Sequence, residues 1–290
     1  MNYAGNVTAD ADIKASQLPV LRAAYSDRTA ALMARLSGVA YEFEFDAPTT
    51  VLPVSLAELG FTSVRSFFDS DTEGAAYLAE SRDLIVLAFR GTTTERTWFT
   101  DFTIDLVGPD GQGVDKRLRL HRGFLNAFEA LARDGLEPAV EAIKERTQGQ
   151  VPIYITGHSL GGALAQIAAA RFGDDQVAAC YTSGSPRVGN AYFDLWVKAP
   201  SYRIVNHADI VPQVPLPIVY RHSGDPRYLP ERVEGSPFRY QPNLVVRFAQ
   251  LTKGLFEAVR KLSLLQVADH AIKQYADKLG KIADARNQQR

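Results

Sequence analysis

The amino-acid sequence predicts an α/β fold, with a mainly parallel central sheet flanked by helices. Short, continuous apolar runs over 84–89, 151–156 and 177–182 are typical of strands that are covered on both faces. Between these runs lie longer segments whose apolar residues recur three and four positions apart, as they do in amphipathic helices. Because such alternation favours strands joined by helices, we expect one α/β domain over residues 1–290.

The individual elements are expected in the following order. A helix over 18–40 precedes two strands, 61–69 and 74–80, on either side of an acidic turn. A third strand follows at 84–89. A long helix over 122–148 should break or kink, because Gly135 and Pro138 interrupt it. The later elements are strand 151–156, helix 161–172, strands 177–182 and 202–206, an apolar helical stretch over 243–267 and a polar one over 271–290.

The composition excludes several classes of function. The formal net charge of −1, from 32 Lys+Arg and 33 Asp+Glu, gives no strong field that would attract nucleic acid or an anionic membrane. No run reaches 18 apolar residues, so no transmembrane segment is expected. The single cysteine, Cys180, lies in an apolar run and is expected to pack in the core. The first residues show no Sec signal peptide, which leaves the location unknown, either cytoplasmic or exported by another route.

The segment Gly157-His158-Ser159-Leu160-Gly161 matches the pattern G-x-S-x-G of serine hydrolases. A strand is expected directly before it and a helix directly after it, which would expose the Ser159 hydroxyl on a tight turn. The amino end of that helix would direct backbone amides toward a developing oxyanion. The alternative is that Ser159 only caps the helix. The context favours a nucleophile.

A serine nucleophile needs a carboxylate and a histidine, which follow it in that order in α/β-hydrolases. Asp209 fits the acid, because it lies just past the strand expected at 202–206. It could instead only cap that turn. Asp194 and Asp225 are the other candidates, and both are expected in surface loops.

Two histidines remain for the base. Chain order excludes His121 and His158, which come before or within the serine motif, and it makes His207 less favoured because His207 precedes Asp209. His270 and His222 both follow Asp209. His270 begins an expected helix and is favoured, with His222 as the alternative.

The sequence resembles the fungal-type triacylglycerol lipases, the class 3 lipases of the α/β-hydrolase superfamily. Five segments carry the resemblance, and Asp269-His270 with Tyr275 is similar to the C-terminal histidine segment of that family. The segments are Phe89-Arg90-Gly91-Thr92, His121-Arg122-Gly123-Phe124, Gly157-His158-Ser159-Leu160-Gly161-Gly162, Gly184-Ser185-Pro186-Arg187-Val188-Gly189-Asn190 and Val205-Asn206-His207-Ala208-Asp209-Ile210-Val211-Pro212.

The resemblance implies a catalytic triad of Ser159, Asp209 and His270, and an oxyanion hole formed by Thr92 and Leu160. It also implies a lid helix over about 93–107, which would cover the site in water and open on lipid. Its apolar side would come from residues that include Trp98, Phe99 and Phe102. A fixed surface helix is the alternative for this segment.

The implied function is serine-dependent hydrolysis of acylglycerols by a triacylglycerol lipase, acting on a lipid or ester substrate at a lipid–water interface. The alternatives are a soluble-ester esterase of the feruloyl type, a phospholipase A1 or diacylglycerol lipase and, more distantly, a non-catalytic binding module. No cofactor is expected, and the histidines show no metal-ligand spacing such as H-E-x-x-H.

The sequence departs from secreted fungal members in three ways. It lacks a disulfide-forming pair and a signal peptide, which indicates a bacterial-style relative. It also carries a long stretch over 236–267 before His270, whose apolar helical face is expected either to pack in the core or to bind lipid.

Overall fold

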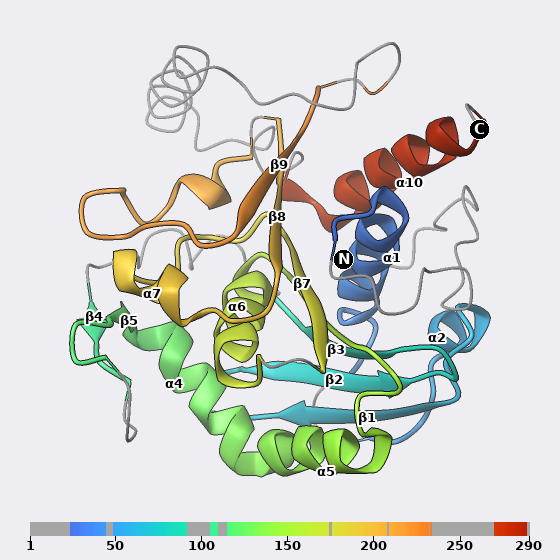
Figure 1. Ribbon diagram of the computed structural model, residues 1–290, viewed down its shortest axis with the longest axis horizontal. Coiled ribbons are helices and arrows are strands. Elements are labelled where there is room, and N and C mark those ends of the chain that lie inside the picture. The colour runs from blue at the N-terminus through green and yellow to red at the C-terminus, as the bar shows by residue number, and fades with distance from the viewer. Residues whose placement is uncertain are drawn as a thin grey trace.

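A seven-stranded sheet forms the centre of the part of the chain that the structure describes (Figure 1). The computed structural model describes residues 24–44, 49–91, 105–109, 115–173, 176–207, 209–231, 233 and 270–288. The strand order is β1-β2-β3-β6-β7-β8-β9. The first three strands are antiparallel to one another, and the strands from β3 onward are parallel. Their bounds are β1 (Ser63–Phe68), β2 (Ala75–Glu80), β3 (Ile85–Phe89), β6 (Ile153–His158), β7 (Val177–Ser183), β8 (Ser201–Asn206) and β9 (Asp225–Leu229).

Helices cover both faces of this sheet. On one face, α1 (Asp27–Val39) and α10 (Ile272–Gln288) lie side by side and share an apolar cluster with the sheet (Figure 1). On the other face, α4 (Arg122–Leu131), α5 (Glu137–Thr147) and α6 (Leu160–Arg171) form a second apolar cluster with the strands. Because both faces are covered, β3 and β6 are buried along their whole length, as their continuous apolar runs predict.

The predicted elements that fall within the described residues form, with boundaries shifted by a few positions. The predicted helix 18–40 begins only at Asp27, where Ser26 caps it by accepting a hydrogen bond from the Thr29 amide. Residues 18–23 lie outside the described part. The predicted helix 122–148 breaks into α4 and α5 at Gly135, whose φ of 104° is a conformation that favours glycine.

Several elements were not predicted. These are α2 (Val54–Glu58), α7 (Ala191–Trp196), β9 and a short hairpin of β4 (Leu106–Val107) with β5 (Leu120–His121). The apolar stretch predicted over 243–267 lies outside the described residues. The segment predicted as polar, 271–290, has a buried face, because α10 packs Tyr275, Leu279, Ile282 and Ala283 against the core.

An ion pair also joins the two neighbouring helices on this face. Arg286 of α10 lies 2.5 Å from the Asp27 carboxylate of α1. Burial raises the pKa of that carboxylate, and the Arg286 charge partly offsets this effect. The pair therefore keeps a largely buried carboxylate from being left without an opposite charge.

Cys180 is buried on β7, as predicted, and burial raises the pKa of its thiol to about 12. Within the described ranges, no helix is both long enough and apolar enough to cross a membrane.

Candidate active site

The predicted site residues lie where neighbouring parallel strands end. Ser159 follows β6, Gly184 follows β7 and Asp209 lies three residues beyond β8. These strands are adjacent in the sheet, so their carboxyl ends meet at one edge. Open parallel sheets commonly bind their ligands at this edge.

Ser159 is the turn residue between β6 and α6. Its φ of 59° and ψ of −129° form a strained combination for a residue with a side chain. Its amide donates to the Ser183 carbonyl at 3.0 Å. Its side chain makes no capping hydrogen bond to the helix, which argues against the alternative that Ser159 only caps α6.

The glycines of the motif let three backbone segments meet at this turn. A Cβ atom on Gly157 would collide with the Gly161 carbonyl, and one on Gly161 would collide with the Phe89 carbonyl at the end of β3. The spacing G-x-S-x-G is therefore a steric requirement of the turn. Leu160 is the first residue of α6, so its amide belongs to the amino end of that helix.

Asp209 is fixed by three donors and is 2% exposed. Its Oδ1 accepts from the Val211 amide at 2.9 Å. Its Oδ2 accepts from the Tyr275 hydroxyl at 2.5 Å and from Nδ1 of His270 at 2.9 Å. Because an ionised carboxylate can only accept, Nδ1 of His270 carries the proton, and Nε2 is then the basic nitrogen of the neutral ring.

Gly184 provides the space for this pair. Its φ is 61°, and a Cβ atom there would lie 2.8 Å from Oδ2 of Asp209 and 3.0 Å from Nδ1 of His270. Gly184 also follows Ser183, whose carbonyl accepts the Ser159 amide. The Asp209–His270 pair is therefore packed against the strand end to which Ser159 is hydrogen-bonded.

Tyr275 connects α10 to the end of β8. Its buried hydroxyl donates to Asp209 and accepts from the Asn206 amide at 3.0 Å. Lys278, one turn further along α10, donates to the Asn206 side chain at 2.6 Å and to the Pro230 carbonyl at 2.9 Å. The sequence indicated Tyr275 only as part of a resemblance, and its spacing from Asp209 gave no sign of this contact.

His158 is buried beside His270, although chain order excluded it as the base. Its Nε2 lies 2.6 Å from the main-chain oxygen of His270, and its Nδ1 lies 2.9 Å from the Tyr41 hydroxyl. The two imidazole centroids are 4.5 Å apart. Burial, and then the proximity of His270, lower the pKa of His158 well below its usual value. No local pattern marks Tyr41, which the sequence analysis missed.

The alternative acids, Asp194 and Asp225, and the alternative base, His222, make contacts with other groups. Nε2 of His222 lies 2.8 Å from the Pro212 carbonyl. Asp194 and Asp225 are exposed, as predicted, but the loop prediction was wrong for both. Asp194 belongs to α7 and accepts from the Gly224 amide, while Asp225 begins β9, which adds to the sheet through backbone pairing with β8.

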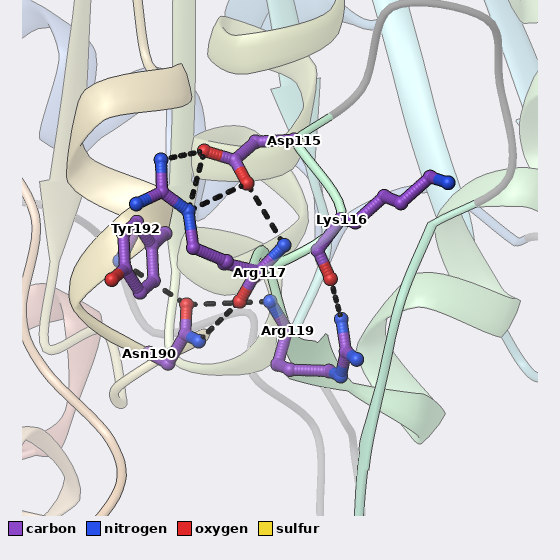
Figure 2. Close-up of polar contacts among 6 residues, drawn as sticks. All are labelled: Asp115, Lys116, Arg117, Arg119, Asn190 and Tyr192. Carbon is purple, nitrogen blue, oxygen red and sulfur yellow. Dashed lines mark hydrogen bonds and ion pairs between the residues drawn. The ribbon is translucent and has the colours of Figure 1, made fainter.

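Asn190, the last residue of the segment 184–190, belongs to the group of polar contacts in Figure 2. Asn190 caps α7, accepts from the Arg119 amide and donates to the Arg117 carbonyl. Arg117 pairs with Asp115 and lies over the Tyr192 ring, 4.5 Å from its centroid. These contacts join the segment before β5 to the start of α7 (Figure 2).

The remaining predicted residues lie outside the described part of the chain. These are Thr92, Trp98, Phe99 and Phe102, with most of the expected lid. Of the predicted lid range 93–107, Leu106 and Val107 form β4, so a helix does not extend over them. Among the described residues, no three His, Cys, Asp or Glu side chains are grouped as a metal site would require.

Residues 86–218 match the model of the family described as lipase (class 3). The matched segment contains Ser159 and Asp209, whereas His270 lies beyond it.

Two of the relatives are fungal lipases. A secreted mono- and diacylglycerol lipase 1 of Fusarium solani is 40% identical over 57% of this chain and 50% of its own length. A lipase of Rhizopus niveus is 34% identical over 50% of this chain and 38% of its own. The chain thus spans half or less of these curated relatives. Both are fungal, so they give the predicted bacterial-style relationship no support.

Solved structures agree on the fold. The Lip2 lipase of Yarrowia lipolytica superposes with a TM-score of 0.58 and 25% identity, covering 70% of this chain and 78% of that one. The chain has the α/β-hydrolase fold, with its mostly parallel sheet flanked by helices.

Proposed function

We propose that this chain is a class 3 lipase that hydrolyses the carboxylic esters of acylglycerols, with Ser159 as the nucleophile. One observation carries the proposal. A serine in a strained backbone conformation, not engaged in helix capping, lies at the strand edge that also holds the buried Asp209–His270 pair. Strain of this kind persists where the surrounding structure enforces it, and it is concentrated at active sites.

In the proposed mechanism, Nε2 of His270 takes the proton of the Ser159 hydroxyl as its oxygen attacks the ester carbonyl. Asp209 holds the imidazole with Nδ1 protonated and stabilises the imidazolium that forms. His270 then returns the proton to the leaving alcohol, which leaves an acyl group on Ser159. In the second half, His270 activates water to release the fatty acid.

The oxyanion is proposed to be held by the backbone amides of Leu160 and Thr92. The Leu160 amide stands at the amino end of α6, where the helix dipole favours negative charge. Thr92 follows Gly91, and a Cβ atom on Gly91 would lie 3.1 Å from the Cβ of Ser159. This proximity supports a role for the segment that begins at Gly91. Two such donors commonly supply a large share of the rate enhancement.

Other parts of the proposal rest on the sequence and the relatives. A lid over about 93–107, bearing Trp98, Phe99 and Phe102, would meet a lipid–water interface. The Fusarium relative is named as secreted, which supports export of this chain. A single domain over residues 1–290 remains part of the proposal.

The preferred acylglycerol is a further proposal. The triglycerides predicted from the sequence remain the proposed substrates. The Fusarium relative is named a mono- and diacylglycerol lipase, which makes partial glycerides the alternative. Hydrolysis of emulsified diolein and triolein by the same preparation would separate the two. Faster release of oleate from diolein would favour the alternative without affecting the serine mechanism.

The function is tested by hydrolysis of p-nitrophenyl butyrate, p-nitrophenyl palmitate and emulsified triolein. Ser159→Ala should lower turnover on the order of a thousand-fold or more. Ser55→Ala, a control on α2 away from the site, should keep activity. Activity on palmitate and triolein supports a lipase, and activity confined to butyrate indicates a soluble-ester esterase. A folded Ser159→Ala variant that retains most of its activity would contradict the mechanism.

A further inference from the structure

We propose that Tyr41 and His158 are positioning residues for His270. On this proposal the Tyr41 hydroxyl holds His158 in one tautomer, and His158 in turn holds the main chain and the ring of His270. The inference rests on the proposed function for its kinetic consequence. The hydrogen-bond arrangement itself can be tested without any substrate.

The hydrogen-bond partners determine the tautomer of His158. Its Nε2 lies 2.6 Å from the main-chain oxygen of His270. A carbonyl oxygen can only accept, so Nε2 must carry a proton. In a neutral ring Nδ1 is then a bare acceptor, and the Tyr41 hydroxyl, 2.9 Å away, is its donor. The direction of every hydrogen bond from Tyr41 to His270 is therefore fixed.

The surroundings of His158 favour the neutral ring. The side chain is buried, and the groups that face it are the Tyr41 hydroxyl, the His270 imidazole and the Tyr275 ring, whose centroid is 6.0 Å away. The carboxylate of Asp209 contacts His270 and Tyr275 in this cluster. Burial and the neighbouring imidazole both lower the pKa of His158. A neutral neighbour also does not oppose the positive charge that His270 acquires during the proposed reaction.

The contact with His158 affects the orientation of His270, the proposed base. Asp209 fixes Nδ1 of the His270 ring, whereas His158 binds its main-chain oxygen and lies along its ring. If His158 adopted the other tautomer, a bare Nε2 would face the His270 carbonyl oxygen at hydrogen-bond distance. Two acceptors repel each other, so His270 would shift away from the position that the Asp209 contact requires.

The backbone of Tyr41 is held in a position from which its hydroxyl reaches His158. Its amide donates to the Gly38 carbonyl at the end of α1. Its hydroxyl occupies the space that a Cβ atom on Gly91 would need, beside the Ser159 turn. One hydroxyl thus touches the His158 ring and the backbone that leads to Thr92, which explains why residue 91 has no side chain.

The test compares Tyr41→Phe with Tyr77→Phe. Tyr77 is a matched control, because its buried hydroxyl also makes a hydrogen bond, in its case to the Leu36 carbonyl. We expect Tyr41→Phe to lower kcat about three- to tenfold with KM unchanged, the factor that one neutral hydrogen bond commonly contributes. Tyr77→Phe should leave kcat within about twofold of the parent value, as expected for a contact outside the site.

A second pair of variants separates positioning from packing. His158→Gln retains a side-chain amide donor that can reach the His270 carbonyl, and it should keep more of kcat than His158→Leu, which retains none. Equal kcat values for two folded variants would overturn the proposal. So would a Tyr41→Phe variant whose kcat matches that of Tyr77→Phe.

Imidazole ¹⁵N NMR of the full chain tests the arrangement without hydrolysis. His158 should be neutral and protonated at Nε2, and Tyr41→Phe should introduce the Nδ1-protonated form. A charged or Nδ1-protonated His158 in the parent protein would refute the inference. If the parent shows no serine-dependent hydrolysis, the proposed function fails. The NMR result then decides the positioning arrangement separately.

Discussion

The strain at Ser159 can be measured by replacing the serine with alanine and with glycine. Both variants lose the hydroxyl, so both should lose the proposed activity. They differ in the backbone, because only glycine adopts a φ of 59° with a ψ of −129° without a steric penalty. We therefore expect Ser159→Gly to be more stable than Ser159→Ala, although glycine substitutions usually destabilise.

The magnitude follows from two opposing terms. Strain in such sparsely populated conformations costs on the order of 1–3 kcal/mol. Glycine loses about 0.5–1 kcal/mol more conformational entropy than alanine on folding. The difference is between about 0 and 2.5 kcal/mol in the free energy of unfolding, in favour of Ser159→Gly. In a chain of this size, it corresponds to a rise in Tm of up to about 4 °C.

Urea denaturation of the two variants, followed by tryptophan fluorescence and circular dichroism, measures this difference directly. Ser55 provides the control, because it lies in α2, where helical backbone favours alanine over glycine. There, Ser55→Gly should be less stable than Ser55→Ala by up to about 1 kcal/mol. If Ser159→Gly were also less stable than Ser159→Ala, by a similar amount, the turn would not be strained and the reasoning would be refuted.

Three further predictions concern the surroundings of the site. Tyr275→Phe should destabilise the fold by about 2–4 kcal/mol in urea denaturation, because Asp209 loses a charge-assisted hydrogen bond and the buried Asn206 amide loses its acceptor; an unchanged midpoint would contradict those contacts. Gly184→Ala should lower kcat by at least about tenfold, since a methyl group would displace Asp209 or the imidazole; full activity in ester hydrolysis would show that the pair does not pack there. Cys180, with its pKa raised to about 12, should resist thiol reagents at pH 8 until the protein is denatured, and rapid labelling of the native chain would show that it is accessible.

The sequence predicted the central strands well because burial on both faces produces a continuous apolar run. Ile85–Phe89 and Ile153–His158 were both located in this way. The edge strand β9 was missed, because Asp225–Leu229 is held by backbone pairing and buries only Leu229 fully. Its Asp-Pro start also reads as a turn. A pattern of side chains does not reveal a strand whose side chains are mostly only half-buried.

The sequence predicted some residues of the candidate site and missed others, because only some of them stand in a local pattern. Ser159 stands in a local pattern whose glycines are sterically required, so the sequence alone located it. Asp209 and His270 followed from chain order and resemblance, and the structure brings their side chains within 2.9 Å. Tyr41 and the role of His158 depend on a contact between residues 117 positions apart. No local periodicity or motif records such a contact.

The docking of α10 against α1 has a consequence for the timing of synthesis. The described residues of the sheet all precede position 230, whereas the proposed base lies immediately before the helix at 272–288. On the ribosome the strands and Ser159 emerge first, and the emerging chain still lacks the imidazole. On the proposed mechanism, Ser159 therefore stays inactive until α10 has left the exit tunnel and packed against α1. A chain that stops before position 270 would carry the proposed nucleophile without the proposed base.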